Sequence, residues 1–192
     1  MGELVQLSVL SLSRNELTGH IPSSLGNLTS LQNLYLHSNM LTGPVPEELC
    51  RLEEMRYISL NINFLTGSIP SGFGSMIVLE YLSFYSNYLT GQIPISLGDL
   101  SNLRVLYLFD NFLTGHIPVV LGDMPLLAEL FLYTNALSGT ISPKLGAMSA
   151  MKYFYLFDNF LTGRLPSELG NLTNLVFLAT HYNMHTGSIP YR

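Results

Sequence analysis

The stretch from Leu100 to Asp123, LSNLRVLYLFDNFLTGHIPVVLGD, is repeated along the whole chain. Shifting it by 24 residues in either direction recovers the same skeleton, Leu-x2-Leu-x2-Leu-x-Leu-x2-Asn-x-Leu-x-Gly-x-Ile-Pro-x2-Leu-Gly. The asparagine of the skeleton recurs without a change of spacing at Asn15, Asn39, Asn63, Asn87, Asn111, Asn135, Asn159 and Asn183. A fixed period of about 20 to 29 residues with this leucine pattern is typical of a solenoid, in which each repeat packs on its neighbours.

The repeats predict one domain that covers residues 1–192. Eight repeats of 24 residues start near residues 4, 28, 52, 76, 100, 124, 148 and 172. Within each repeat, the alternation around Leu106 and Leu108 has period two and indicates a short strand with one buried face. The following Asn111 can bond backbone groups where the chain turns, and Gly115 allows a positive φ or a close approach of the next coil. Stacked copies then form a parallel sheet, and we expect the stacked asparagines to form a ladder that satisfies polar groups otherwise buried.

Composition excludes several classes of function. The net charge is -5 and the eight Lys and Arg residues are scattered, so we expect no nucleic-acid partner. No apolar run approaches the roughly 18 residues of a spanning helix, which predicts no direct membrane insertion. Cys50 is the only cysteine, so the chain can form no internal disulfide.

The N-terminal residues MGELVQLSVLSLS already follow the repeat register, with leucines at Leu4, Leu7, Leu10 and Leu12. We therefore interpret them as part of the solenoid and not as a signal peptide. An end repeat normally carries a polar outer face. Because this one is apolar, we expect either a missing N-terminal cap, with the chain a fragment, or end-to-end self-association.

Aromatic residues are concentrated at positions that should face solvent. If Leu106 and Leu108 point inward, Tyr107 and its outward neighbours form columns across the sheet. Nine aromatic residues of these columns lie in repeats four to seven and are called the aromatic patch: Tyr81, Tyr85, Tyr107, Phe109, Phe131, Tyr133, Tyr153, Tyr155 and Phe157. Exposed apolar patches mark interaction sites, which predicts a ligand-binding surface. The alternative is a ladder that only stabilises the sheet, by about 0.2–1 kcal/mol per pair.

Two further rows flank this surface. Residues directly after the repeat asparagine extend it along one rim: Phe64, Tyr88, Phe112 and Phe160. On the other flank we expect Arg104, Glu129 and Lys152 to form a row of solvated charges.

No arrangement of residues predicts catalysis or a metal site. Asp110 and Asp158 share one column but lie two repeats apart, about 10 Å by strand spacing, with no cleft to raise the pKa of either carboxyl group. His37 and His181 share a column but are separated by roughly 29 Å, too far to hold one metal ion. We expect no enzyme activity, no metal and no cofactor.

The blocks LTGHIPVVLG (113–122), LTGQIPISLG (89–98) and LTGSIPSGFG (65–74) closely resemble plant-type leucine-rich repeats. These occur in receptor-like kinases, receptor-like proteins and polygalacturonase-inhibiting proteins. The resemblance implies an α/β-type repeat solenoid, a right-handed superhelix with a concave parallel β-sheet. It also implies an extra strand near the LTGxIP segment and short 3₁₀ turns on the convex side.

The resemblance also implies a function. Members of this family act outside the cell or at its surface and bind peptides, small hormones or other proteins. We therefore expect a non-catalytic recognition module, receptor-like or inhibitor-like, that binds a peptide or protein through the aromatic patch. Two sequons on the expected convex side, at Asn27 and Asn171, are candidate N-glycosylation sites.

Two alternatives remain open from the sequence. The apolar N-terminal end favours a structural or self-assembling solenoid. A regular column of threonines raises the third possibility of an ice-binding protein; it contains Thr18, Thr42, Thr66, Thr90, Thr114 and Thr162.

Overall fold

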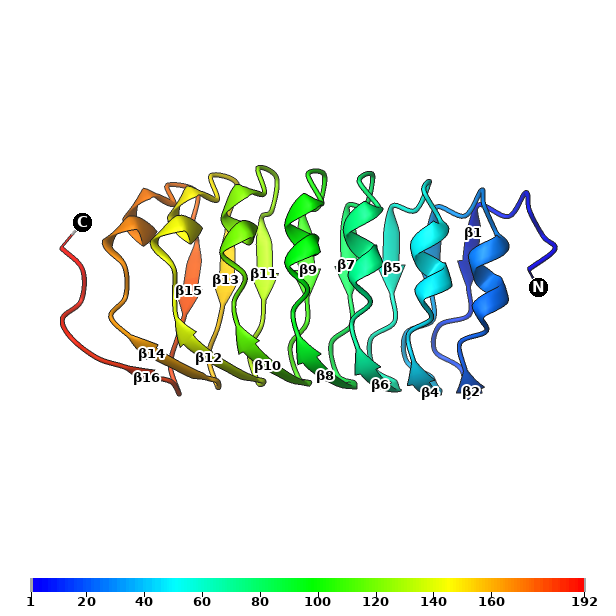
Figure 1. Cartoon of the computed structure of the whole chain (residues 1–192), viewed down its shortest axis with the longest axis horizontal. Coiled ribbons are helices and arrows are strands. Elements are labelled where there is room, and N and C mark those ends of the chain that lie inside the picture. The colour runs from blue at the N-terminus through cyan, green and yellow to red at the C-terminus, as the bar shows by residue number, and fades with distance from the viewer. Residues whose placement is uncertain (1, 192) are drawn as a thin grey trace.

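The computed structural model describes residues 2–191 as a stack of similar coils with the two termini at opposite ends (Figure 1). Each coil contains a short strand, a turn, a second strand and, in the first seven coils, a 3₁₀ helix. The strands form two parallel eight-stranded sheets, each ordered by repeat. This arrangement confirms the predicted leucine-rich repeat solenoid, including the second strand and the 3₁₀ turns.

The first sheet contains β1 (Val9–Ser11), β3 (Asn33–Tyr35), β5 (Tyr57–Ser59), β7 (Tyr81–Ser83), β9 (Val105–Tyr107), β11 (Glu129–Phe131), β13 (Tyr153–Tyr155) and β15 (Phe177–Ala179). The second sheet contains β2 (Thr18–His20), β4 (Met40–Pro44), β6 (Phe64–Ser68), β8 (Tyr88–Gln92), β10 (Phe112–His116), β12 (Ala136–Thr140), β14 (Phe160–Gly163) and β16 (Met184–His185). The 3₁₀ helices are η1 (Ser23–Asn27), η2 (Glu47–Arg51), η3 (Ser71–Ser75), η4 (Ile95–Asp99), η5 (Val119–Asp123), η6 (Pro143–Ala147) and η7 (Ser167–Asn171).

Repeat leucines build one continuous core between the two sheets and the 3₁₀ helices. Leu106 is in register with Leu82 and Leu130 of the neighbouring strands, so equivalent side chains stack directly on one another. Leu106 and Leu108 are fully buried, as the alternation predicts. No repeat could bury its leucines alone, since each apolar side chain is covered by its counterparts above and below.

The turn between the two strands has a left-handed residue in every repeat. Asp110 has φ 56° although it is not glycine, and Asp is one of the few residue types that tolerates this conformation. Gly115 has φ 78°, the first of the two roles that the sequence left open for glycine at that position. The left-handed residue before the repeat asparagine was not predicted from the sequence.

The repeat asparagines form the predicted ladder. Asn111 Oδ1 accepts a hydrogen bond from the backbone N–H of Leu89 at 3.0 Å. Its Nδ2 donates to the carbonyl of Phe84 at 3.0 Å and to that of Leu108 at 3.2 Å. The amide therefore bonds both its own repeat and the preceding one, and it satisfies backbone groups that are buried from water.

The first coil exposes apolar side chains, as its leucine-rich sequence predicts. Leu4, Val5 and Val9 are exposed, and Leu7 and Leu12 are only partly covered by the core.

Replacing a buried ladder asparagine should destabilise the whole stack. Asn111→Ala leaves the Leu89 N–H without a partner and removes one of two hydrogen bonds from the Phe84 and Leu108 carbonyls, which keep those from Asn87 and Asn135. We therefore expect the free energy of unfolding to fall by about 2 kcal/mol. Asn15→Ala is the matched control, because the same motif position is exposed in the first repeat. Equal losses for the two variants, measured by urea denaturation, would contradict this role of the ladder.

Candidate ligand-binding surface

Strands β7, β9, β11 and β13 present three outward columns of side chains. The first residue of each strand lies in the first column, which includes Tyr81 and Tyr153. The last residue of each strand lies in the middle column, which includes Tyr107. The position two residues after each strand forms an outer column. These columns contain all nine residues of the predicted aromatic patch, and each of the nine is half-buried on the sheet surface and not in the core.

The outer column is a continuous stack of rings. Tyr85, Phe109, Tyr133 and Phe157 follow one another with centroids 4.3 Å apart and ring planes 9° to 13° from parallel. His181 continues the stack at 4.5 Å from Phe157. Such offset stacking is favourable beyond the burial of area alone. The histidine extends the surface into the last repeat, a contribution that the sequence did not reveal.

The middle column forms a second, shorter stack. Tyr107, Phe131 and Tyr155 are spaced by 4.4 Å. Tilted contacts at 6.2–6.4 Å, such as Tyr107 to Phe109, join the two stacks. Because the rings of the two stacks contact one another within and between the columns, their side chains have little freedom left to lose on binding.

The first column is less regular. Tyr81 meets Tyr107 edge to face at 5.8 Å. Tyr153 lies apart from both stacks, because its neighbour in the preceding repeat is Glu129 and not a ring. The structure therefore brings eight of the nine predicted residues into ring contact and places Tyr153 at the border of the patch.

Glu129 is not a solvated charge, which corrects the expectation from the sequence. The Tyr107 hydroxyl donates a hydrogen bond to the Glu129 carboxylate, and Glu129 is half-buried beside the rings. Arg104 and Lys152 are exposed on the flank as expected. Glu129 lies on β11, which pairs with β9, so its carboxylate can reach the Tyr107 hydroxyl on the neighbouring strand.

Two phenol groups of the patch, those of Tyr107 and Tyr133, have a raised pKa. Burial raises the pKa of Tyr107, and the hydrogen bond and the charge of Glu129 raise it further. Burial and the nearby Asp110 carboxylate raise the pKa of Tyr133 to about 12. The patch therefore presents the neutral hydroxyl groups of Tyr107 and Tyr133 among apolar rings, a combination that suits the binding of peptide side chains and backbone groups.

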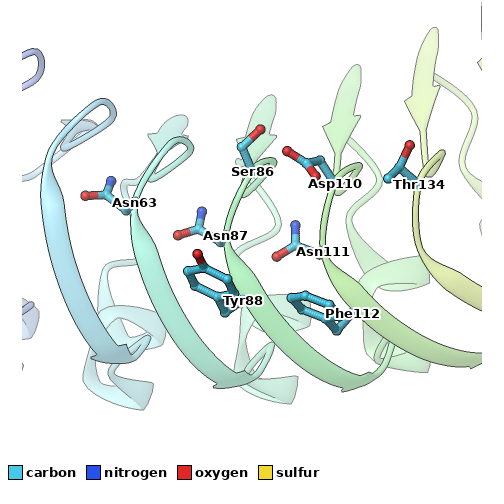
Figure 2. Close-up of a pocket in the computed structure, with 8 residues that line it drawn as sticks. All are labelled: Asn63, Ser86, Asn87, Tyr88, Asp110, Asn111, Phe112 and Thr134. Carbon is cyan, nitrogen blue, oxygen red and sulfur yellow. The ribbon is translucent and has the colours of Figure 1, made fainter.

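A groove of about 290 Å³ lies along one edge of the patch (Figure 2). Its upper wall carries Ser86, Asp110 and Thr134, and its lower wall carries the rings of Tyr88 and Phe112. The repeat asparagines Asn63, Asn87 and Asn111 form its floor. Two of the four rim residues predicted from the sequence, Tyr88 and Phe112, thus line this groove.

The remaining site predictions concern glycans, metals and membranes. Asn27 and Asn171 are both exposed, at the ends of η1 and η7, and their glycosylation stays a prediction. Across residues 2–191, no three His, Cys, Asp or Glu side chains come together as a metal site. No helix in the same range is long and apolar enough to cross a bilayer.

Raising the pH should weaken the fold through Tyr133. Because its pKa is raised from 10.0 to about 12, its contribution to stability is complete below about pH 10 and is lost as pH rises towards 12. Tyr133→Phe should therefore lose less stability than wild type across this range, measured by chemical denaturation. Between about pH 7 and 9 the two proteins should respond alike; parallel curves up to pH 12 would contradict the raised pKa.

Comparisons with known proteins support this description. The family model for the Leucine Rich Repeat matches residues 6–28, 30–52, 78–100, 102–124 and 150–172. No curated protein sequence matches the chain.

Several solved structures are similar. The plant peptide hormone receptor RGFR1, solved in complex with RGF2, is 38% identical with a TM-score of 0.98 over 98% of this chain and 30% of the receptor chain. The ectodomain of the receptor kinase GASSHO1/SCHENGEN3 from Arabidopsis thaliana, solved with CASPARIAN STRIP INTEGRITY FACTOR 2, is 32% identical with a TM-score of 0.84 over 99% of this chain and 26% of its own. A plant ice-binding protein is 27% identical with a TM-score of 0.69 over 94% of this chain and 74% of its own.

The chain spans less than a third of the length of these two receptor chains. The family model covers more than half of the chain, and the plant receptor ectodomains match it along almost its full length. The chain therefore belongs to the leucine-rich repeat family and is of the plant type.

Proposed function

We propose that this chain is a non-catalytic recognition module that binds a peptide or protein ligand through the aromatic patch, outside the cell or at its surface. The observation that carries this proposal is the pair of ring stacks on the solvent side of the first sheet, where side chains such as Phe109 and Phe131 stay partly exposed. The receptor RGFR1, similar over 98% of this chain, is described as a peptide hormone receptor in complex with RGF2.

Strand pairing alone does not explain the aromatic residues. Strands β5 and β7 pair in the same register as the later strands, yet their middle column contains Ser59 and Ser83. The outer column of repeat three contains Asn61 where later repeats have rings. The fold therefore does not require aromatic residues at these positions, and their concentration in repeats four to seven favours a binding role over a purely structural ladder.

Removing three rings of the aromatic patch should strongly weaken the binding of a peptide ligand. Tyr107→Ala/Tyr133→Ala/Tyr155→Ala opens both stacks, so peptides selected on the wild-type chain from a displayed random peptide library should bind the variant at least about thirtyfold more weakly. Affinity is measured by surface plasmon resonance, with circular dichroism to verify folding.

The matched control is Ile77→Ala/Ile95→Ala/Val119→Ala, which removes the same number of exposed apolar side chains elsewhere on the surface. Its peptide affinity should equal that of wild type. If no peptide is enriched, or if the enriched peptides bind the aromatic variant as tightly as wild type, the aromatic patch is not a peptide-binding surface.

The threonine column supports a second candidate function, ice binding. The column lies on the outward face of the second sheet, where the hydroxyls of Thr42, Thr114 and Thr162 donate to glycine carbonyls of the preceding repeats. This gives a regular row of exposed methyl and hydroxyl groups with one residue per strand. The similarity to a plant ice-binding protein is consistent with this candidate.

Ice binding makes a simple prediction. The purified chain should lower the freezing point of water below the melting point, and Thr66→Lys/Thr90→Lys/Thr114→Lys should remove this effect because three long charged side chains interrupt the row. A nanolitre osmometer measures the difference. Absence of thermal hysteresis in the wild-type chain eliminates this candidate and leaves peptide binding unaffected.

A further inference from the structure

The aromatic row of the second sheet lacks one ring. Phe64, Tyr88 and Phe112 begin β6, β8 and β10, and their rings stack at 6.0 and 5.9 Å with planes 14° and 9° from parallel. Ala136 begins β12, and Phe160 begins β14. The row therefore has a vacant place between the rings of Phe112 and Phe160. By analogy with Tyr88, a ring in this place would lie about 6 Å from each of its two neighbours.

Exposure shows that this place is open to solvent. Phe112 and Phe160 are 56% and 55% exposed, compared with 47% for Tyr88, which has a ring on either side. Asn111 and Asn159 are buried, whereas Asn135 beneath the vacancy is only partly buried.

The same two repeats that provide the rings also provide a negative charge. Residues 108–115 and 156–163 have the identical sequence LFDNFLTG, whereas residues 132–139 between them read LYTNALSG. Asp110 and Asp158 thus flank Thr134 as Phe112 and Phe160 flank Ala136. Both carboxylates are exposed, and neither belongs to an ion pair within residues 2–191.

We propose that this guanidinium slot, formed by Asp110, Phe112, Thr134, Ala136, Asp158 and Phe160, binds one arginine side chain of a peptide or protein partner. The guanidinium group is planar, permanently charged and able to stack on aromatic faces. In the vacant place it lies within about 6 Å of both ring centroids, the distance at which a cation is attracted by a ring. Its outer N–H groups point towards the two carboxylates, which lie about 10 Å apart by strand spacing.

The two small residues give the slot its selectivity. Thr134 and Ala136 leave the place between the two rings open, and a planar guanidinium group can turn its flat faces to both rings there, whereas the tetrahedral ammonium group of lysine has no flat face. Figure 2 shows Asp110 and Phe112 on opposite sides of the groove, with Thr134 in the next repeat. A ligand that follows this groove would carry its cation directly into the slot.

The slot borders the aromatic patch. Phe109 and Tyr133 of the outer ring stack precede Asp110 and Thr134 in the chain. This inference rests on the proposed function in one respect: if a peptide binds the aromatic patch, an arginine of that peptide should lie near repeat six. The slot can nevertheless be tested alone, with a probe that needs no contact with the aromatic patch.

The probe is the capped peptide acetyl-Gly-Ser-Arg-Gly-Ser-Gly-amide, and its control has citrulline, a neutral analogue of similar shape, in place of arginine. Binding to the full chain is followed by NMR of the methyl groups of Thr134 and Ala136. We expect both signals to shift in a saturable way with the arginine peptide. The citrulline peptide should bind about tenfold more weakly or not at all.

Two variants test the slot itself. Asp110→Asn/Asp158→Asn should weaken binding of the arginine peptide by about tenfold, whereas Glu53→Gln/Asp99→Asn changes the net charge equally at exposed distant positions and should leave binding unchanged. Ala136→Phe fills the vacant place with the chain's own ring and should abolish binding; the Thr134 methyl signal then reports on the slot. Ala136→Ser keeps the slot open and should retain binding.

Three results would overturn the guanidinium slot: equal binding of the arginine and citrulline peptides, undiminished binding by Ala136→Phe, or equal losses in the two charge variants. The triple aromatic variant separates this outcome from the proposed function. If peptides selected on the wild-type chain lose affinity for that variant while the slot variants bind normally, the aromatic patch is the binding surface and the slot is not.

Discussion

The hydrogen bonds of the repeat asparagines are the interaction on which the rest of the structure depends. Each amide bonds its own turn and the backbone of the preceding repeat, as Asn111 does with Leu108, Phe84 and Leu89. These bonds cross from repeat to repeat at one constant offset, which holds the coils in phase. A slip of one residue would turn the buried leucines outward and leave the asparagines buried without partners.

In-phase stacking also means that the residue types at a few outward positions decide the chemistry of a whole surface. Because equivalent positions lie directly above one another, a residue type repeated in adjacent coils becomes a continuous column. Ser59 and Ser83 make the middle column polar in repeats three and four, and Tyr107, Phe131 and Tyr155 make it aromatic in the next three. The packing of the core leucines does not depend on which residue type occupies these outward positions. The outward positions can therefore differ between repeats and contribute to ligand binding.

The two candidate surfaces combine the same chemical elements in different geometry. In the aromatic patch the rings of the two stacks lie with their centroids 4.3–4.4 Å apart, and burial and nearby carboxylates raise the pKa of the Tyr107 and Tyr133 hydroxyl groups. At the guanidinium slot one ring is missing from a looser row, and two carboxylates stand free. The first surface suits apolar and hydrogen-bonding groups, and the second suits a cation.

The sequence by itself determined the fold, the outward columns and the ladder, because a constant 24-residue period places the Cα atoms of equivalent residues in line. The repeat pattern was enough to predict that Tyr107 and Tyr133 lie on the outward face of the sheet and that Gly115 takes a positive φ or allows a close approach of the next coil. Only the tertiary structure decided that Glu129 accepts from Tyr107, that Tyr153 stands apart, that His181 prolongs a stack and that Asp110 is left-handed. These features depend on rotamers and on the side chains of neighbouring columns, which a periodic pattern does not specify.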